Sequence, residues 1–148
     1  MKVVKVIKLP LSLVVVFLGT NDFQSMHHYS ANQSAQGVAS LVTAIRQAPI
    51  EPGMLVPEVM VVAPPAIEQV QGEMATKFQG AQRNAIGLPA ALRDVANSLQ
   101  CDFFDAGKVA QTSQVDGIHL DADQHRNLGV AIAASVLPIL NRNQNTAA

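Results

Sequence analysis

Three short apolar segments, separated by stretches with helical periodicity, constrain the fold of this chain more than any other feature. The segments Leu13–Leu18, Val59–Ala63 and Asp102–Asp105 are short, contain β-branched or aromatic residues, and are each followed by turn residues. Strands that alternate with helices predict parallel βαβ units, and continuous apolar runs predict a sheet covered on both faces. The sequence therefore predicts an α/β fold with three layers.

Helical periodicity fills the intervals between the predicted strands. One helix is expected over Ser34–Gln47 and another over Asp123–Leu140, where apolar residues recur at helical spacing. Asp121 and Gln124 form a plausible capping box at the start of the latter helix. A further helical stretch covers Glu73–Leu99, with an interruption near Gly87-Leu88-Pro89, because proline disfavours helix in the residue before it.

Length and composition indicate a single globular domain. The chain has 148 residues, of which 49% are hydrophobic and 14% are charged. This hydrophobic content is well above that of disordered chains. We therefore expect one domain over residues 1–148, with residues 141–148 as a frayed tail. A net charge of -1 gives no basic footprint for nucleic acid. The single cysteine, Cys101, excludes an internal disulfide and is interpreted as a core residue.

The N-terminal residues resemble a targeting segment in part. Lys2, Lys5 and Lys8 precede an apolar run, as in a signal peptide, but the run ends in Thr20-Asn21-Asp22 instead of a small-residue cleavage site. The run is also shorter than the ~20 residues that a transmembrane helix needs. We expect a cytoplasmic protein that does not associate with membranes, with secretion as the less favoured alternative.

A side-chain amide follows the first predicted strand, in the sequence Gly19-Thr20-Asn21-Asp22. In open parallel sheets, ligands bind at the carboxyl ends of the strands, which is where this turn lies. The amide of Asn21 can donate a hydrogen bond to an oxyanion that develops on a carbonyl under attack. Asn and Asp are also common turn residues after a strand, so a purely structural role is an alternative.

The segment "QVDGIHLDADQH" carries the second group of polar side chains, after the third predicted strand. Asp116 lies three residues before His119 in a glycine-containing loop, close enough for the carboxylate to bond one imidazole nitrogen and leave the other as a general base. A capped-helix loop without catalytic function is an alternative. A metal site is a third interpretation, with ligands from His119, Asp121, Asp123 and His125. Against it, His119 and His125 flank the predicted helix start and share no helical face. Near the end of the first predicted strand, residues Met26–Tyr29, which include His27 and His28, are expected to form an exposed loop.

Taken together, "LPLSLVVVFLGTNDF", "VMVVAPP" and "CDFFDAGKVAQTSQVDGIHLDADQHRNLG" resemble the C-terminal part of the SGNH, or GDSL-type, hydrolases, and in particular the bacterial arylesterases. The resemblance extends from about Leu9 to Leu140. It implies a flavodoxin-like sheet and hydrolysis of carboxylic esters through an acyl-enzyme, without metal or cofactor. It also implies that Asn21 is an oxyanion-hole donor, that His119 is the general base and that Asp116 orients it.

The chain departs from the pattern of this family. It contains no Gly-Asp-Ser motif, which carries the nucleophile of the family, and it lacks the following loop glycine that gives a second amide to the oxyanion hole. The nucleophile is therefore unassigned, since Ser12, Ser25, Ser30 and Ser113 lack the strand-to-helix setting that activates a serine. The resemblance implies that the first two strands of the family are missing, which leaves the strand at Leu13–Leu18 exposed at an edge. We expect a second copy of the chain, or a complementing N-terminal polypeptide, to cover it. The favoured interpretation is a hydrolase of small esters, of which this chain is a truncated form. The alternatives are a noncatalytic oligomeric domain and one half of a split hydrolase.

Overall fold

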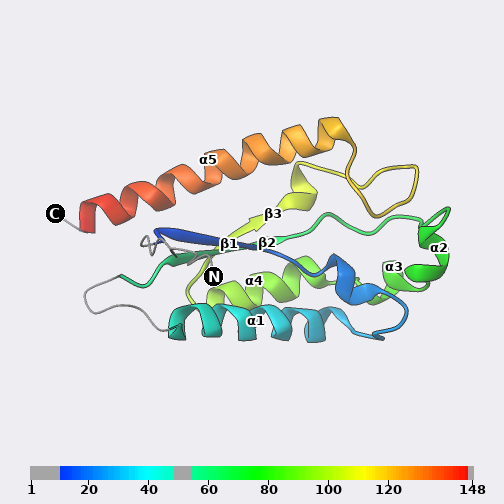
Figure 1. Cartoon of the computed structure of the whole chain (residues 1–148), viewed down its shortest axis with the longest axis horizontal. Helices are drawn as coiled ribbons and strands as arrows, with labels where there is room; N and C mark the ends of the chain where they lie inside the picture. The colour runs from blue at the N-terminus through cyan, green and yellow to red at the C-terminus, as the bar shows by residue number, and fades with distance from the viewer. Residues whose placement is uncertain (1–10, 49–54, 147–148) are drawn as a thin grey trace, which may run out of the picture.

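A computed structural model describes residues 11–48 and 55–146 of the chain, and its centre is a three-stranded parallel sheet (Figure 1). The strands β1 (Leu13–Phe17), β2 (Glu58–Ala63) and β3 (Asp102–Asp105) lie in the order β1-β2-β3. Val15 is opposite Met60 in the first pair, and Val62 is opposite Phe104 in the second. All three predicted strands are confirmed, and their shared direction brings their carboxyl ends to one edge of the sheet.

Helices cover both faces of this sheet, as Figure 1 shows, with α5 (Ala122–Thr146) on one face and α1 (Ala31–Gln47) with α4 (Leu88–Ser98) on the other. The buried strand β2 supplies side chains to both layers. Val59 and Val61 belong to the core cluster with α1 and α4, whereas Met60 and Val62 belong to the cluster with α5. The predicted three-layer α/β fold is therefore confirmed.

The helix α1 begins at Ala31, earlier than predicted, because Ser30 caps it. The backbone N–H of Gln33 donates to the Ser30 side chain (3.4 Å), and the backbone N–H of Ser30 donates to Oε1 of Gln33 (2.9 Å). This reciprocal capping box satisfies two N–H groups that the helix itself leaves without partners.

The capping box predicted at the start of α5 is not formed. The side chain of Gln124 instead accepts from the backbone N–H of Gln111 (2.9 Å) and donates to the carboxylate of Asp123 (2.9 Å). Gln124 thereby fastens the preceding loop to the helix, which is a role that local sequence spacing does not reveal. At its other end, α5 continues past the predicted end at Leu140, into the segment predicted as a tail, as far as Thr146.

The stretch predicted as one interrupted helix contains three helices: α2 (Met74–Lys77), α3 (Ala81–Asn84) and α4. The predicted interruption at Gly87 is confirmed. A second break, at Gly80, was not predicted. Both glycines have left-handed backbone conformations, with φ of 79° at Gly80 and 87° at Gly87, which glycine adopts more readily than other residues.

The predicted resemblance to a targeting segment, with Lys2, Lys5 and Lys8, concerns residues that lie outside the described ranges. Within the described ranges, no helix has the length and hydrophobicity that crossing a membrane requires.

Candidate active site

Asn21 lies on η1 (Thr20–Phe23), a short 3-10 turn directly after β1. The turn starts at Gly19, whose φ of 127° is unfavourable for residues with a side chain. A Cβ atom at Gly19 would also lie 3.3 Å from Oγ of Ser34 and 3.3 Å from Cδ2 of Leu88. Glycine at this position therefore lets the turn pack closely against α1 and α4.

Two side-chain hydrogen bonds hold this turn. Oγ of the buried Ser34 donates to Oδ2 of Asp22 (2.6 Å), which ties the turn to α1. Nε2 of Gln24 donates to Oδ1 of Asn21 (3.1 Å). Because the carbonyl oxygen of the Asn21 amide faces Gln24, its NH₂ group is the end directed elsewhere, and it makes no hydrogen bond within the described part of the chain. Asn21 can therefore donate to a substrate oxygen.

The predicted contact between Asp116 and His119 is present. Nδ1 of His119 lies 2.5 Å from Oδ2 of Asp116. The other carboxylate oxygen, Oδ1, accepts from the backbone N–H groups of Ile118 (2.8 Å) and His119 (3.0 Å). The hydrogen bond from His119, followed by these two backbone hydrogen bonds, lowers the pKa of Asp116 from 3.8 to about 2.

The ionised state of Asp116 defines the tautomer of His119. A carboxylate only accepts hydrogen bonds, so Nδ1 of His119 must carry the proton that it shares with Asp116. Nε2 is then the basic nitrogen of the neutral ring, and no hydrogen bond to it is formed within residues 11–48 and 55–146. The side chain of His119 is 67% exposed, so a substrate or water can reach it.

The loop that carries this pair is braced by the segment after β2, a contact that the sequence did not reveal. The backbone N–H of Glu68 donates to the carbonyl of Gly117 (3.0 Å), and that of Gln71 donates to the carbonyl of Asp116 (3.2 Å). Gly117 has a φ of 77°, and a Cβ atom there would lie 2.6 Å from the carbonyl oxygen of Gln69. The backbones approach so closely that only glycine fits without a shift.

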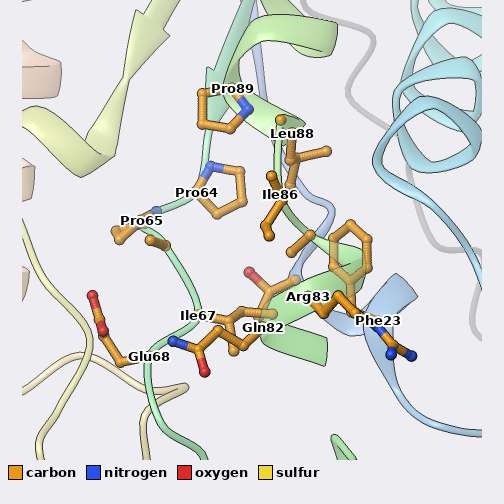
Figure 2. A pocket seen from close by; sticks show the side chains of 14 residues that line it. Phe23, Pro64, Pro65, Ile67, Glu68, Gln82, Arg83, Ile86, Leu88 and Pro89 are labelled. Atoms are coloured by element: carbon orange, nitrogen blue, oxygen red, sulfur yellow. The ribbon is translucent and has the colours of Figure 1, made fainter. Parts of the chain in front are cut away.

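Three hollows at the carboxyl edge of the sheet share Pro64 in their walls. Asn21 lines a groove of about 390 Å³ that runs beside the end of β1. A second hollow, of about 490 Å³, has walls of proline rings and aliphatic side chains, with the polar side chains of Glu68, Gln82 and Arg83 around it (Figure 2). The third, of about 470 Å³, lies beside Asp105. Neither Asp116 nor His119 lines any of these three.

The structure joins Asp116 to His119 but does not join either to Asn21. The turn with Asn21 follows β1, and the loop with the pair follows β3, with β2 between them. Two strand spacings separate the ends of β1 and β3 by about 10 Å. The two parts of the predicted site therefore share the carboxyl edge of the sheet, and within the described residues no hydrogen bond connects them.

The remaining candidate residues have local structural roles. Among the serines, Ser25 donates to the carbonyl of Thr76 (3.1 Å), Ser30 caps α1, and Oγ of Ser113 accepts from the backbone N–H of Val115 (3.1 Å). Ser12 precedes β1 and so lies at the opposite, amino edge of the sheet.

The other histidines and the proposed metal ligands lie in two separate segments. His27, His28 and Tyr29 form an exposed loop, as predicted, in which the ring of His27 stacks on that of Tyr29 at 5.7 Å between centroids. Across the described ranges, no three histidine, cysteine or acidic side chains are grouped so that they could hold a metal ion, and the set that includes Asp121 and His125 is no exception.

Comparisons with known proteins agree on one group of hydrolases. A family model described as the GDSL-like lipase/acylhydrolase family matches residues 5–127. A solved carbohydrate acetylesterase family member from Sinorhizobium meliloti superimposes with a TM-score of 0.84 and 34% identity, covering 90% of this chain and 64% of that one. The native aryl esterase of M. smegmatis superimposes with a TM-score of 0.82 and 33% identity, covering 89% of this chain and 63% of that one. The chain thus spans less than two thirds of either neighbour, and comparison with curated proteins gives no significant match.

Proposed function

We propose, from the premise that this chain belongs to the GDSL-like lipase/acylhydrolase, or SGNH, family, that it carries the general base and one oxyanion donor of a carboxylic ester hydrolase. The observation that supports this most directly is the 2.5 Å contact between His119 and the ionised Asp116, which leaves Nε2 of His119 basic and accessible. Asn21 supports it further, because its NH₂ group is turned away from Gln24, which bonds its carbonyl oxygen.

The proposed mechanism begins when Nε2 of His119 takes the proton of an attacking hydroxyl group. The oxygen of that hydroxyl bonds to the ester carbonyl carbon, and the carbonyl oxygen becomes an oxyanion that accepts a hydrogen bond from Nδ2 of Asn21. The imidazolium of His119 stays bonded to Asp116, whose negative charge stabilises it. His119 then returns the proton to the leaving alcohol as the carbon–oxygen bond breaks and the carbonyl re-forms.

The attacking hydroxyl is the part of this mechanism that the chain does not assign to a side chain. No Gly-Asp-Ser occurs in the sequence, and Ser25, Ser30 and Ser113 are held in local hydrogen bonds. For the chain alone we propose water as the nucleophile. Serine hydrolases that lose a triad member retain about 10³–10⁴-fold acceleration over water from binding and the oxyanion hole. We therefore expect slow turnover unless a second polypeptide supplies a serine.

The proposed substrates are small esters. The structural neighbours are described as a carbohydrate acetylesterase and an aryl esterase, which indicates acetyl or aryl esters. The hollow of about 490 Å³, bounded by Phe23, Leu88 and several prolines, offers apolar walls to such a group (Figure 2).

Hydrolysis of p-nitrophenyl acetate tests this proposal. General base catalysis contributes about 10²–10⁴-fold, so His119→Ala should lower the rate of the purified chain by at least about 100-fold or to the buffer rate. Asp116→Asn should also lower it, because the asparagine no longer favours the required tautomer. His28→Ala is the matched control, since His28 is an exposed histidine in another loop and should leave the rate unchanged. Equal rates for the wild type and His119→Ala would exclude His119 as a general base in this chain alone.

A noncatalytic oligomeric α/β domain is the second candidate. The absence of a Gly-Asp-Ser motif from the sequence favours it, because the remaining polar groups then have no nucleophile to assist. In that case the wild type and the three variants of the assay hydrolyse the ester at one common rate.

A further inference from the structure

The backbone of the turn that carries Asn21 is tied to two different helices. On one side, Oγ of Ser34 in α1 donates to the carboxylate of Asp22 (2.6 Å). On the other side, the backbone N–H of Ser25 donates to the carbonyl of Lys77, the last residue of α2 (2.8 Å). These bonds lie within four residues of Asn21, so they fix its place on the backbone and leave rotation of its side chain as its main freedom.

The amide of Asn21 has two ends with opposite hydrogen-bonding properties. The bond between Cβ and Cγ has a broad and roughly two-fold torsion, so two orientations of the amide are accessible. One directs the NH₂ group outward, where it can donate to an oxyanion, and the other directs the carbonyl oxygen outward, where it repels the same charge. The bonds that hold the backbone of the turn do not distinguish these two orientations. A group that contacts the amide itself has to select between them.

Gln24 contacts the amide of Asn21 at its carbonyl end. Nε2 of Gln24 donates to Oδ1 of Asn21 (3.1 Å), and within residues 11–48 and 55–146 this is the one hydrogen bond that the Asn21 side chain makes. A hydrogen bond to an amide oxygen polarises the amide, so that its NH₂ group becomes a stronger donor. Gln24 lines none of the three hollows at this edge of the sheet. Its effect on a substrate therefore passes through Asn21.

We propose that Gln24 is a positioning residue, which orients the amide of Asn21 so that its NH₂ group faces the substrate. This proposal rests on the proposed function, because an outward NH₂ group assists a reaction only where an oxyanion forms. As the carbonyl oxygen of the ester gains negative charge, the hydrogen bonds from Gln24 to Asn21 and from Asn21 to that oxygen strengthen one another. The competing arrangement is the reversed pair, in which Nδ2 of Asn21 donates to Oε1 of Gln24.

Scalar couplings across the hydrogen bond test the orientation of the amide without any substrate. In the isotope-labelled wild type, a long-range HNCO experiment is expected to correlate Nε2 of Gln24 with the side-chain carbonyl carbon, Cγ, of Asn21. The reversed pair would instead correlate Nδ2 of Asn21 with Cδ of Gln24. The reversed correlation, or no correlation in either direction, overturns the proposal.

Side chains that only accept or only donate at this position test the effect on the reaction. The carboxylate of Gln24→Glu only accepts, so it should bond the NH₂ group of Asn21 and turn the carbonyl oxygen toward the substrate. The kcat for p-nitrophenyl acetate should then fall by about 10²–10³-fold or to the buffer rate, as in Asn21→Ala, with little change in KM. Gln24→Lys keeps a donor and should largely retain kcat. The matched controls are Gln36→Glu and Gln36→Lys, which place the same charges at an exposed position of α1 and should leave the rate unchanged.

The two experiments separate this proposal from the proposed function. If His119→Ala hydrolyses the ester as fast as the wild type while the coupling from Gln24 to Asn21 is observed, the proposed base is refuted and the orientation of the amide stands. If His119→Ala loses the rate but Gln24→Glu keeps the kcat of the wild type, the base stands and the positioning role of Gln24 is refuted. A urea unfolding midpoint of Gln24→Glu close to that of the wild type shows that a lower kcat does not come from unfolding.

Discussion

Substituting Gly117 by alanine tests whether the close approach of two backbones positions the Asp116–His119 pair. The Cβ atom of the new alanine would lie 2.6 Å from the carbonyl oxygen of Gln69 and 2.8 Å from its carbonyl carbon. Side-chain carbons do not approach backbone atoms so closely, so one of the two segments has to move. The hydrogen bonds that join them, from Glu68 to Gly117 and from Gln71 to Asp116, lie at this contact.

The expected cost has two parts. An alanine in the left-handed conformation costs about 1–2 kcal/mol. Weakening two hydrogen bonds adds about 0.5–1.5 kcal/mol for each. The free energy of unfolding should therefore fall by about 2–5 kcal/mol, of which about 1–3 kcal/mol comes from the separation of the two segments and not from the φ angle.

Gly72→Ala is the matched control, because Gly72 also has a positive φ, of 57°, but a Cβ atom there meets nothing within 4 Å. Urea unfolding of both variants separates the two parts of the cost. The downfield NMR signal of the Nδ1 proton of His119 reports the hydrogen bond to Asp116, and it should be lost or shifted only in Gly117→Ala. Equal losses of stability with an unchanged signal in both variants would refute the idea that this contact positions the pair.

Three further predictions concern single groups. Ser34→Ala removes a hydrogen bond to the carboxylate of Asp22 (2.6 Å), so in urea titrations the free energy of unfolding should fall by about 1.5–3 kcal/mol. Ser40→Ala, on the exposed side of the same helix, is the control and should change that free energy by less than about 0.5 kcal/mol. The pKa of Asp116 is lowered from 3.8 to about 2, so the contribution of its carboxylate to stability is complete above pH 3.8 and is lost as the pH falls through about 2. The stability of Asp116→Asn should therefore depend less steeply on pH between about 2 and 4, as measured by acid unfolding. Gly129→Ala, in the exposed helix α5 with nothing within 4 Å of its Cβ, should raise the melting temperature, since alanine is favoured over glycine in helices by about 1 kcal/mol.

The fold was predictable from the sequence because its signals are local. The strand at Asp102–Asp105 is found with the predicted bounds, since two aromatic residues stand between turn-forming segments on either side. The errors fall where distant residues decide. Gln124 has the spacing of a capping residue for Asp121, but its side chain bonds Gln111 in the preceding loop, and such competition from another segment is invisible to a spacing rule.

The candidate site divides in the same way. Asp116 and His119 are three residues apart, so their contact follows from sequence spacing and is present. The groups that hold them come from the segment Glu68–Gln71, far away in the chain, and only the folded structure brings these together. Gln24, by contrast, is three residues from Asn21 and was not predicted, because an amide next to a turn has no pattern that distinguishes it from ordinary polar surface.

The position of Asn21 separates the proposed oxyanion donor from the proposed base. The turn that carries Asn21 is fixed to α1 through Asp22 and Ser34. Asn21 lines the groove of about 390 Å³ together with Phe17 and Leu18, which are exposed at the end of β1. His119 follows β3, on the other side of β2, and its side chain is 67% exposed. An ester that used both groups would therefore have to reach across the end of β2, where Pro64 lines the same groove.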